Sequence, residues 1–164
     1  MEGSRDDRDV GEPLRVQLYV RHNTFGARTQ QQRLFERVRR LEARSRIERT
    51  ELRRWPDRIP ANERSELGDV IGEFEAWAAD RDLALAPCFD RREVESRFGG
   101  GRYERISLPI MCLAVYRNGR LQRVAPHVDG DRSYTVYDCI DDLEERLTGE
   151  KRRSLRGSDA IVPP

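Results

Sequence analysis

Apolar and polar positions follow two different periods in the first third of the chain. Over residues 14–20 every second residue is apolar, which is typical of a strand with one buried face. From about residue 28 to residue 44 the apolar residues recur every three or four positions and predict an amphipathic helix. Residues 47–55 predict a second strand, which Pro56 and Pro60 end.

A second helix and a buried strand follow. Residues 65–80 carry apolar side chains at helical spacing, with Ser65 or Asn62 as the N-cap. Residues 106–116 are almost continuously apolar and predict a central strand that is covered on both faces. Between these two segments, residues 83–105 have no firm period, although a short strand at residues 83–89 fits the pattern.

The end of the pattern predicts a hairpin and a closing helix. Asn118-Gly119 is the strongest short hairpin signal, and residues 121–126 supply the returning strand. Thr135 and Asp138 then have the spacing of a helix cap, and residues 135–147 are amphipathic. Helices that alternate with strands, followed by a hairpin and a helix, indicate an α/β fold with a mixed sheet.

The boundaries of the pattern predict one α/β domain over residues 13–148. Residues 1–12 mix both charge signs and predict a disordered tail, and residues 149–164 predict a disordered basic tail. No stretch has the length or apolarity of a signal peptide or of a membrane helix, so we expect a cytoplasmic protein.

The second half of the pattern resembles thioredoxin-fold proteins. In that family an apolar strand that opens on a cis-proline leads to an Asn-Gly hairpin, a returning strand, a loop and a closing helix. Leu108-Pro109-Ile110, Asn118-Gly119 and residues 135–147 follow the same order, and residues 16–41 resemble the family's first strand and active-site helix. The resemblance implies a thioredoxin-like mixed sheet in the order strand-helix-strand-helix-strand-strand-helix, with helices packed on its faces. Whether the peptide before Pro109 is cis or trans stays open.

The redox pair of that family is absent here. Its Cys-x-x-Cys would fall at residues 24–27, which are Thr-Phe-Gly-Ala, and disulfide exchange needs two thiols. The resemblance therefore implies a non-enzymatic module of unknown role that binds a protein or a small ligand. The residues that it implies for binding are Thr24, Gly26, Arg28 and Pro109. Residues 56–103 depart from the family and look like an insertion. The whole chain is also similar to small uncharacterised haloarchaeal proteins, some of which are labelled helix-turn-helix.

Charge is balanced over the chain but not along it. The 164 residues carry a net charge of +1, and only one of the 31 basic residues is a lysine. This balance excludes a uniformly basic nucleic-acid tail and a cysteine-rich secreted scaffold. Residues 28–54 nevertheless hold ten arginines against four glutamates, whereas residues 129–150 hold eight acids against two arginines. A local anion-binding face is therefore compatible with the neutral total.

The basic segment carries an alternative function, that of a DNA-binding regulator of the helix-turn-helix type. One stripe of the first predicted helix consists of Arg33, Arg37, Arg40 and Arg44. Arginine binds phosphate through its bidentate guanidinium, and the surrounding letters RRLE resemble the end of a winged-helix unit. A solvated helix face explains the same stripe. A helix-turn-helix also needs two helices joined by three or four residues, and here a strand and two prolines separate them.

Other chemistry is sparse. His22 and His127 have no partner at ligand spacing, and Cys88, Cys112 and Cys139 form no zinc pattern; the last two fit small buried apolar positions. Nucleotide-binding, calcium-loop and hydrolase motifs are also missing. We therefore expect no metal site and no cofactor, and a binding protein rather than an enzyme. The partner is an unknown protein or small molecule, or DNA under the alternative, and the oligomeric state stays open.

Overall fold

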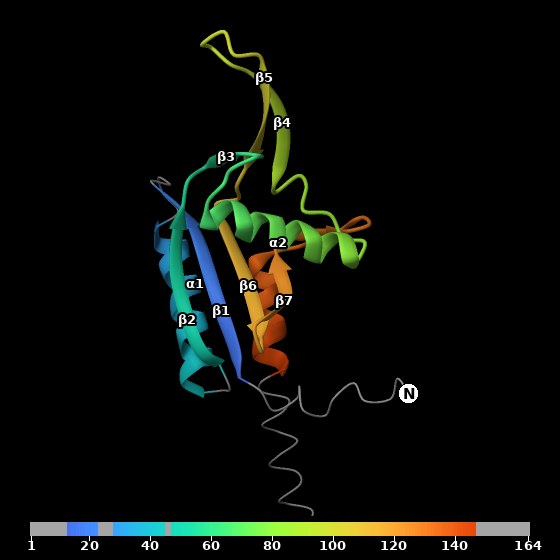
Figure 1. Ribbon diagram of the computed structural model, residues 1–164. Helices are drawn as coiled ribbons and strands as arrows, with labels where there is room; N and C mark the ends of the chain where they lie inside the picture. Colours follow the sequence, from blue (N-terminus) through green and yellow to red (C-terminus); the bar gives the residue numbers. More distant parts are fainter. Residues whose placement is uncertain (1–12, 23–27, 45–46, 147–164) are drawn as a thin grey trace, which may run out of the picture.

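The computed structural model describes residues 13–22, 28–44 and 47–146. Its main sheet has four strands in the order β2-β1-β6-β7 (Figure 1). These strands are β1 (Leu14–Arg21), β2 (Ile47–Trp55), β6 (Met111–Arg117) and β7 (Arg120–Ala125). β1 pairs parallel with β2 and antiparallel with β6, and β6 pairs antiparallel with β7. The predicted α/β class with a mixed sheet is confirmed.

Helices cover both faces of this sheet. α1 (Arg28–Arg44) and a C-terminal helix, described over residues 136–146, pack on one face, and α2 (Glu66–Asp80) crosses the other (Figure 1). Leu34 and Val38 of α1 share a core with Ile140 of the C-terminal helix. On the opposite face Phe74 and Trp77 of α2 lie in a second core. The apolar stripes of the three helices thus bury both surfaces of one sheet.

β1 is buried on both faces, although its alternating pattern predicted only one. Arg15 on its polar side is exposed, but the middle of that side faces the core that α2 covers. Gln17 is buried there together with Tyr19, whose hydroxyl donates to Gln17 Oε1 over 2.6 Å. The Gln17 amide in turn donates to Glu51 of β2 over 3.4 Å. Hydrogen bonds between neighbouring strands make the burial of these polar groups tolerable.

Local signals at helix and hairpin ends are confirmed. The Ser65 hydroxyl accepts a bond from the Gly68 N–H and caps α2. Thr135 and Asp138 bond each other's backbone N–H at the start of the C-terminal helix. Asn118 and Gly119, at φ 54° and 73°, form the turn between β6 and β7. Both residues are left-handed, as a two-residue turn that matches the strand twist requires.

A second sheet includes most of residues 83–105, for which the pattern predicted no register. β3 (Arg58–Pro60), β5 (Arg102–Ser107) and β4 (Asp90–Glu95) pair in that order, and all neighbours are antiparallel. The hairpin of β4 and β5 projects beyond α2 and away from the main sheet (Figure 1). We call residues 90–107 the arm. Residues 83–89 form no strand; a single bridge joins Ala84 to Val128.

The predicted strand at residues 106–116 is in fact two strands in different sheets. β5 ends at Ser107 and β6 begins at Met111. Between them Pro109 has no N–H to donate to a ladder, so the chain changes sheets there. The peptide before Pro109 is trans; in the described residues the cis bonds precede Pro87 and Pro126.

A small hairpin precedes the C-terminal helix. It consists of β8 (His127–Asp129) and β9 (Arg132–Tyr134). The predicted tails, residues 1–12 and 149–164, lie outside the described residues. None of the described helices has the length and apolarity needed to cross a membrane.

Candidate nucleic-acid interface

Helix α1 carries basic residues on the side that faces away from the sheet. Leu34 and Val38 are buried, because they repeat at the spacing of one helix face and meet the strands there. Arg33, Arg39 and Arg40 are exposed. Two of the predicted stripe residues, Arg33 and Arg40, therefore point to solvent about 10 Å apart along the helix axis.

Arg37 is bound to the C-terminal helix. Its Nε donates to Glu144 Oε1 over 3.0 Å, and its Nη2 donates to Asp141 Oδ1 over 2.7 Å and to Glu144 Oε2 over 3.0 Å. Hydrogen bonds to the two carboxylates raise the pKa of the Arg37 guanidinium. Its charge is already neutralised, so it is not presented to an external anion as Arg33 and Arg40 are.

Arg33 and Arg40 are different in this respect. Neither forms an ion pair with any acid in the described part of the chain. Arg39 lies beside them, 5.9 Å from the Phe35 ring centroid and 4.0 Å from the Glu42 carboxylate. The side chain of Arg44 lies outside the described residues. The basic surface of α1 is thus formed by Arg33 and Arg40, with Arg39 at its margin.

α1 and α2 do not form the two-helix unit of a helix-turn-helix. β2 and β3 intervene between them, and the two helices pack on opposite faces of the sheet (Figure 1). The helix that lies on the same face as α1 is the C-terminal one, to which Arg37 connects it. The expected separation of the first two helices by a strand is confirmed.

The other predicted binding site centres on Pro109. Its carbonyl accepts a bond from Trp55 Nε1 over 3.0 Å, and Arg21 donates to the neighbouring carbonyl of Leu108. The backbone N–H of Arg21 also donates to the carbonyl oxygen of Ile110 over 2.9 Å. Pro109 therefore lies at the carboxyl ends of β1 and β2. Thr24 and Gly26 lie outside the described residues, as does the side chain of Arg28.

His127 has a structural environment that the sequence did not reveal. Its Nδ1 lies 2.6 Å from the Val124 carbonyl, and its ring stacks on Tyr134 with centroids 4.7 Å apart. Burial and the hydrogen bond to Asp142 raise the pKa of Tyr134. These two rings line a pocket of about 570 Å³ with Asp129 and Asp141. The pocket joins residues from β8, β9 and the C-terminal helix.

Two of the three cysteines occupy core positions. Cys112 and Cys139 are buried, as predicted. Burial raises the pKa of the Cys139 thiol to about 11 and that of Cys112 well above its ordinary value. Within the described residues no group of three or more His, Cys, Asp or Glu is placed to hold a metal ion.

Comparison with known proteins adds one finding. A family model described as a helix-turn-helix domain matches residues 8–148. Neither the curated proteins nor the solved structures include a match to the chain. The thioredoxin-fold resemblance has no support from these comparisons, whereas the helix-turn-helix label is confirmed. Because the match covers most of the sequence, the chain belongs to the helix-turn-helix domain family.

Proposed function

We propose that the protein binds duplex nucleic acid through the exposed basic surface of α1. The observation that carries the proposal is the pair Arg33 and Arg40, which are exposed and have no acid partner in the described residues. Membership of a helix-turn-helix family supports the same partner. The mode of binding differs from that of two helices joined by a short turn, because α1 and α2 lie on opposite sheet faces.

The chemistry of this surface suits a phosphate backbone. Each guanidinium offers a planar set of N–H donors that matches phosphate oxygens, and each contact releases condensed counterions. Gln30 and Gln32 are exposed near the N-terminal end of α1 and add neutral donors and acceptors. Arg37 connects α1 to the C-terminal helix, because its carboxylate partners Asp141 and Glu144 come from that helix.

The proposal is tested by titrating a labelled 20-base-pair duplex at several salt concentrations. We expect affinity to fall as salt rises, and Arg33→Ala/Arg40→Ala to reduce the slope of log K against log salt by about 2. The control is Arg64→Ala/Arg120→Ala, which removes the same charge from exposed positions away from α1. Binding absent at low salt contradicts the proposal, and so does an equal loss in both double variants.

A second candidate is a binding site of thioredoxin-like type at the carboxyl ends of β1 and β2. The main sheet and its helices follow the order strand-helix-strand-helix-strand-strand-helix, and this order supports the resemblance. The convergence of Arg21, Trp55 and Pro109 supports the location. Residues 24–27 lack cysteine, so the protein should not accelerate insulin reduction by dithiothreitol. Appreciable acceleration would refute this candidate in its non-redox form.

A further inference from the structure

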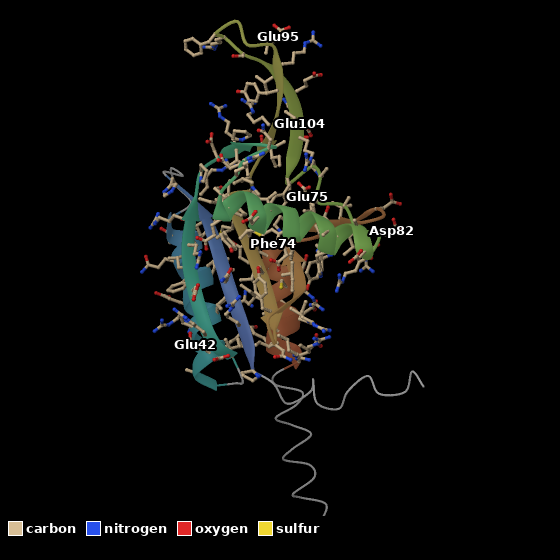
Figure 2. All side chains as sticks on the ribbon, viewed as in Figure 1. Glu42, Phe74, Glu75, Asp82, Glu95 and Glu104 are labelled. Carbon is tan, nitrogen blue, oxygen red and sulfur yellow. The ribbon has the colours of Figure 1, made fainter. Side chains whose placement is uncertain are left out.

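The arm is a ribbon of two strands, β4 and β5, to which β3 pairs at the base. β4 and β5 have six residues each, so the ribbon is about 20 Å long. Only its base is packed: Ile106 is buried, whereas the outer residues are exposed. Figure 2 shows Glu104 part of the way along the ribbon and Glu95 near its outer end. A projecting ribbon whose outer side chains are exposed is a candidate surface for contact with another molecule.

Charge is sorted between the two faces of the arm. The first face carries the side chains at alternate positions 91, 93 and 95 of β4 and 102, 104 and 106 of β5. Arg91 on this face bonds Glu75 of α2 and Glu104 of β5, so its charge is neutralised. Arg102 lies 3.5 Å from Glu95. Glu93 adds a further negative charge, so this face is acidic overall.

The second face is basic and carries an aromatic ring. Its members come from all three strands, and we call them the Arg–Tyr face: Arg58, Arg92, Tyr103 and Arg105. Arg92 pairs with Asp90 over 2.7 Å, but Arg58 and Arg105 have no acid partner in the described residues. The Arg105 Nε is buried without a hydrogen bond. Tyr103 is 43% exposed and lies one alternate position beyond Arg105, toward the outer end of the arm.

The tip of the arm carries an exposed phenylalanine, Phe98. Ser96 N–H donates to the Gly101 carbonyl over 2.9 Å and closes the loop, and Gly99 and Gly101 take φ values of 70° and 79°. Phe98 is 97% exposed at this point, next to the exposed Arg97. The free energy falls when a phenylalanine side chain moves from water into an apolar contact. The tip therefore combines a cation, a flexible glycine loop and an aromatic ring.

We propose that the arm binds duplex DNA along its groove, with Phe98 inserted between base pairs and the Arg–Tyr face on the phosphates. The inference rests on the proposed function, because it names a second contact of the same protein with DNA. Charge complementarity selects this occupant: the basic face opposes phosphate, while the acidic face turns toward α2. Proteins that kink DNA combine basic ribbons or helices with such apolar wedges.

The test uses a 30-base-pair duplex with a fluorophore at each end and a second duplex that contains 2-aminopurine. We expect the wild-type protein to shorten the end-to-end distance and to raise 2-aminopurine fluorescence by unstacking. Phe98→Ala should lose both signals and bind roughly tenfold more weakly, with an unchanged salt slope. Phe98→Leu should retain part of the bending. The control is Tyr137→Ala, which removes another exposed aromatic ring, on the C-terminal helix.

A second variant tests two basic residues, Arg58 of the Arg–Tyr face and Arg97 of the tip. Arg58→Ala/Arg97→Ala changes exposed residues only and should reduce the salt slope by about 2. If wild-type protein binds no duplex at all, the proposed function fails and the arm inference fails with it. If Arg33→Ala/Arg40→Ala weakens binding but Phe98→Ala binds and bends DNA as wild type does, only the arm inference is wrong. Loss of self-association in Phe98→Ala, without an effect on DNA, would assign the tip to a second copy of the chain and overturn the inference.

Discussion

The two sheets of this protein use the same strand geometry in opposite surroundings. β6 in the main sheet has five consecutive buried residues, and both of its faces are covered by helices. β4 in the arm has no fully buried residue, and charged side chains occupy most of its positions. The main sheet is therefore held by apolar burial, whereas the arm is held by its backbone ladder, by a small base around Ile106 and by ion pairs.

Because of this difference, we expect substitutions in the main sheet to change the stability of the fold and substitutions on the arm to change its exposed surface. A change in the main sheet alters a packed interior, in which a missing methylene group is not compensated. A change on the arm alters a solvated surface and leaves the core intact. We therefore expect substitutions at exposed positions of the arm to change its surface without loss of folding.

The largest expected effect comes from Phe74→Ala. Phe74 is fully buried and contacts the rings of Tyr19 and Phe89 edge-on, at centroid distances of 6.0 and 6.3 Å. Removing it should lower the free energy of unfolding by about 3–5 kcal/mol. The matched control, Phe98→Ala, should cost less than about 0.5 kcal/mol because that ring is exposed. Urea unfolding measures both, and similar losses would refute the contrast between core and arm.

The second largest expected effect is a loss of stability at alkaline pH, caused by a buried cysteine of the C-terminal helix. Burial raises the pKa of Cys139 to about 11, from an ordinary value of 9.0. The folded state thus favours the protonated thiol: its contribution is complete below pH 9 and is lost as pH rises to 11. Two pKa units correspond to about 2–3 kcal/mol. Burial raises the pKa of Tyr116 to about 12, which extends the loss to higher pH.

The variant Cys139→Ala isolates this effect. Its unfolding free energy, measured by urea titration from pH 8 to 11, should decline less steeply than that of the wild type. Parallel curves for the two proteins would show that Cys139 does not contribute to the pH dependence.

Thr135→Ala should cost about 1 kcal/mol, because it removes the cap of the C-terminal helix. The backbone N–H and the hydroxyl of Thr135 both donate to the Asp138 carboxylate and lower its pKa. The difference between variant and wild type should therefore shrink as pH falls below 3.8, the ordinary value for that group. Ser133→Ala, which removes an exposed hydroxyl from β9, is the control. A pH-independent difference would argue that the carboxylate is not part of the cap.

The smallest effect is expected at the tip of the arm. Two extra glycines between Gly100 and Gly101 should cost less than about 0.5 kcal/mol, because the loop is exposed and closure entropy grows slowly with length. The same insertion between Asn118 and Gly119 should cost about 1 kcal/mol, because it breaks a two-residue turn in the main sheet. Thermal unfolding compares the two proteins. Equal costs would mean that the arm contributes to the core.

Much of the main sheet could be predicted because burial leaves a periodic pattern. Leu34 and Val38 indicated the buried side of α1, and Asn118-Gly119 located the hairpin. The split at Pro109 was missed, because a chain that changes sheets while buried stays apolar throughout. The arm was missed for the opposite reason. Charged residues on both of its faces leave no apolar period to detect.

The candidate site was predictable only as a list of residues. Helical spacing placed Arg33, Arg37 and Arg40 on one stripe, and that much follows from the sequence alone. Their division into two exposed residues and one paired residue depends on Asp141 and Glu144. These partners are more than 100 residues away and meet Arg37 only once the fold is complete. No local pattern contains that information.

The central place of β1 fixes an order of events during synthesis. Its antiparallel register joins Leu14 to Arg117, so one edge of β1 stays unpaired until residues 111–117 have left the ribosome. At about 5–20 residues per second, the residues between β2 and β6 take several seconds to appear. A nascent chain stalled before β6 would expose an apolar strand edge and would be prone to aggregate. Folding of the main sheet therefore joins segments far apart in the sequence, whereas the hairpin of the arm pairs residues that are close in the sequence.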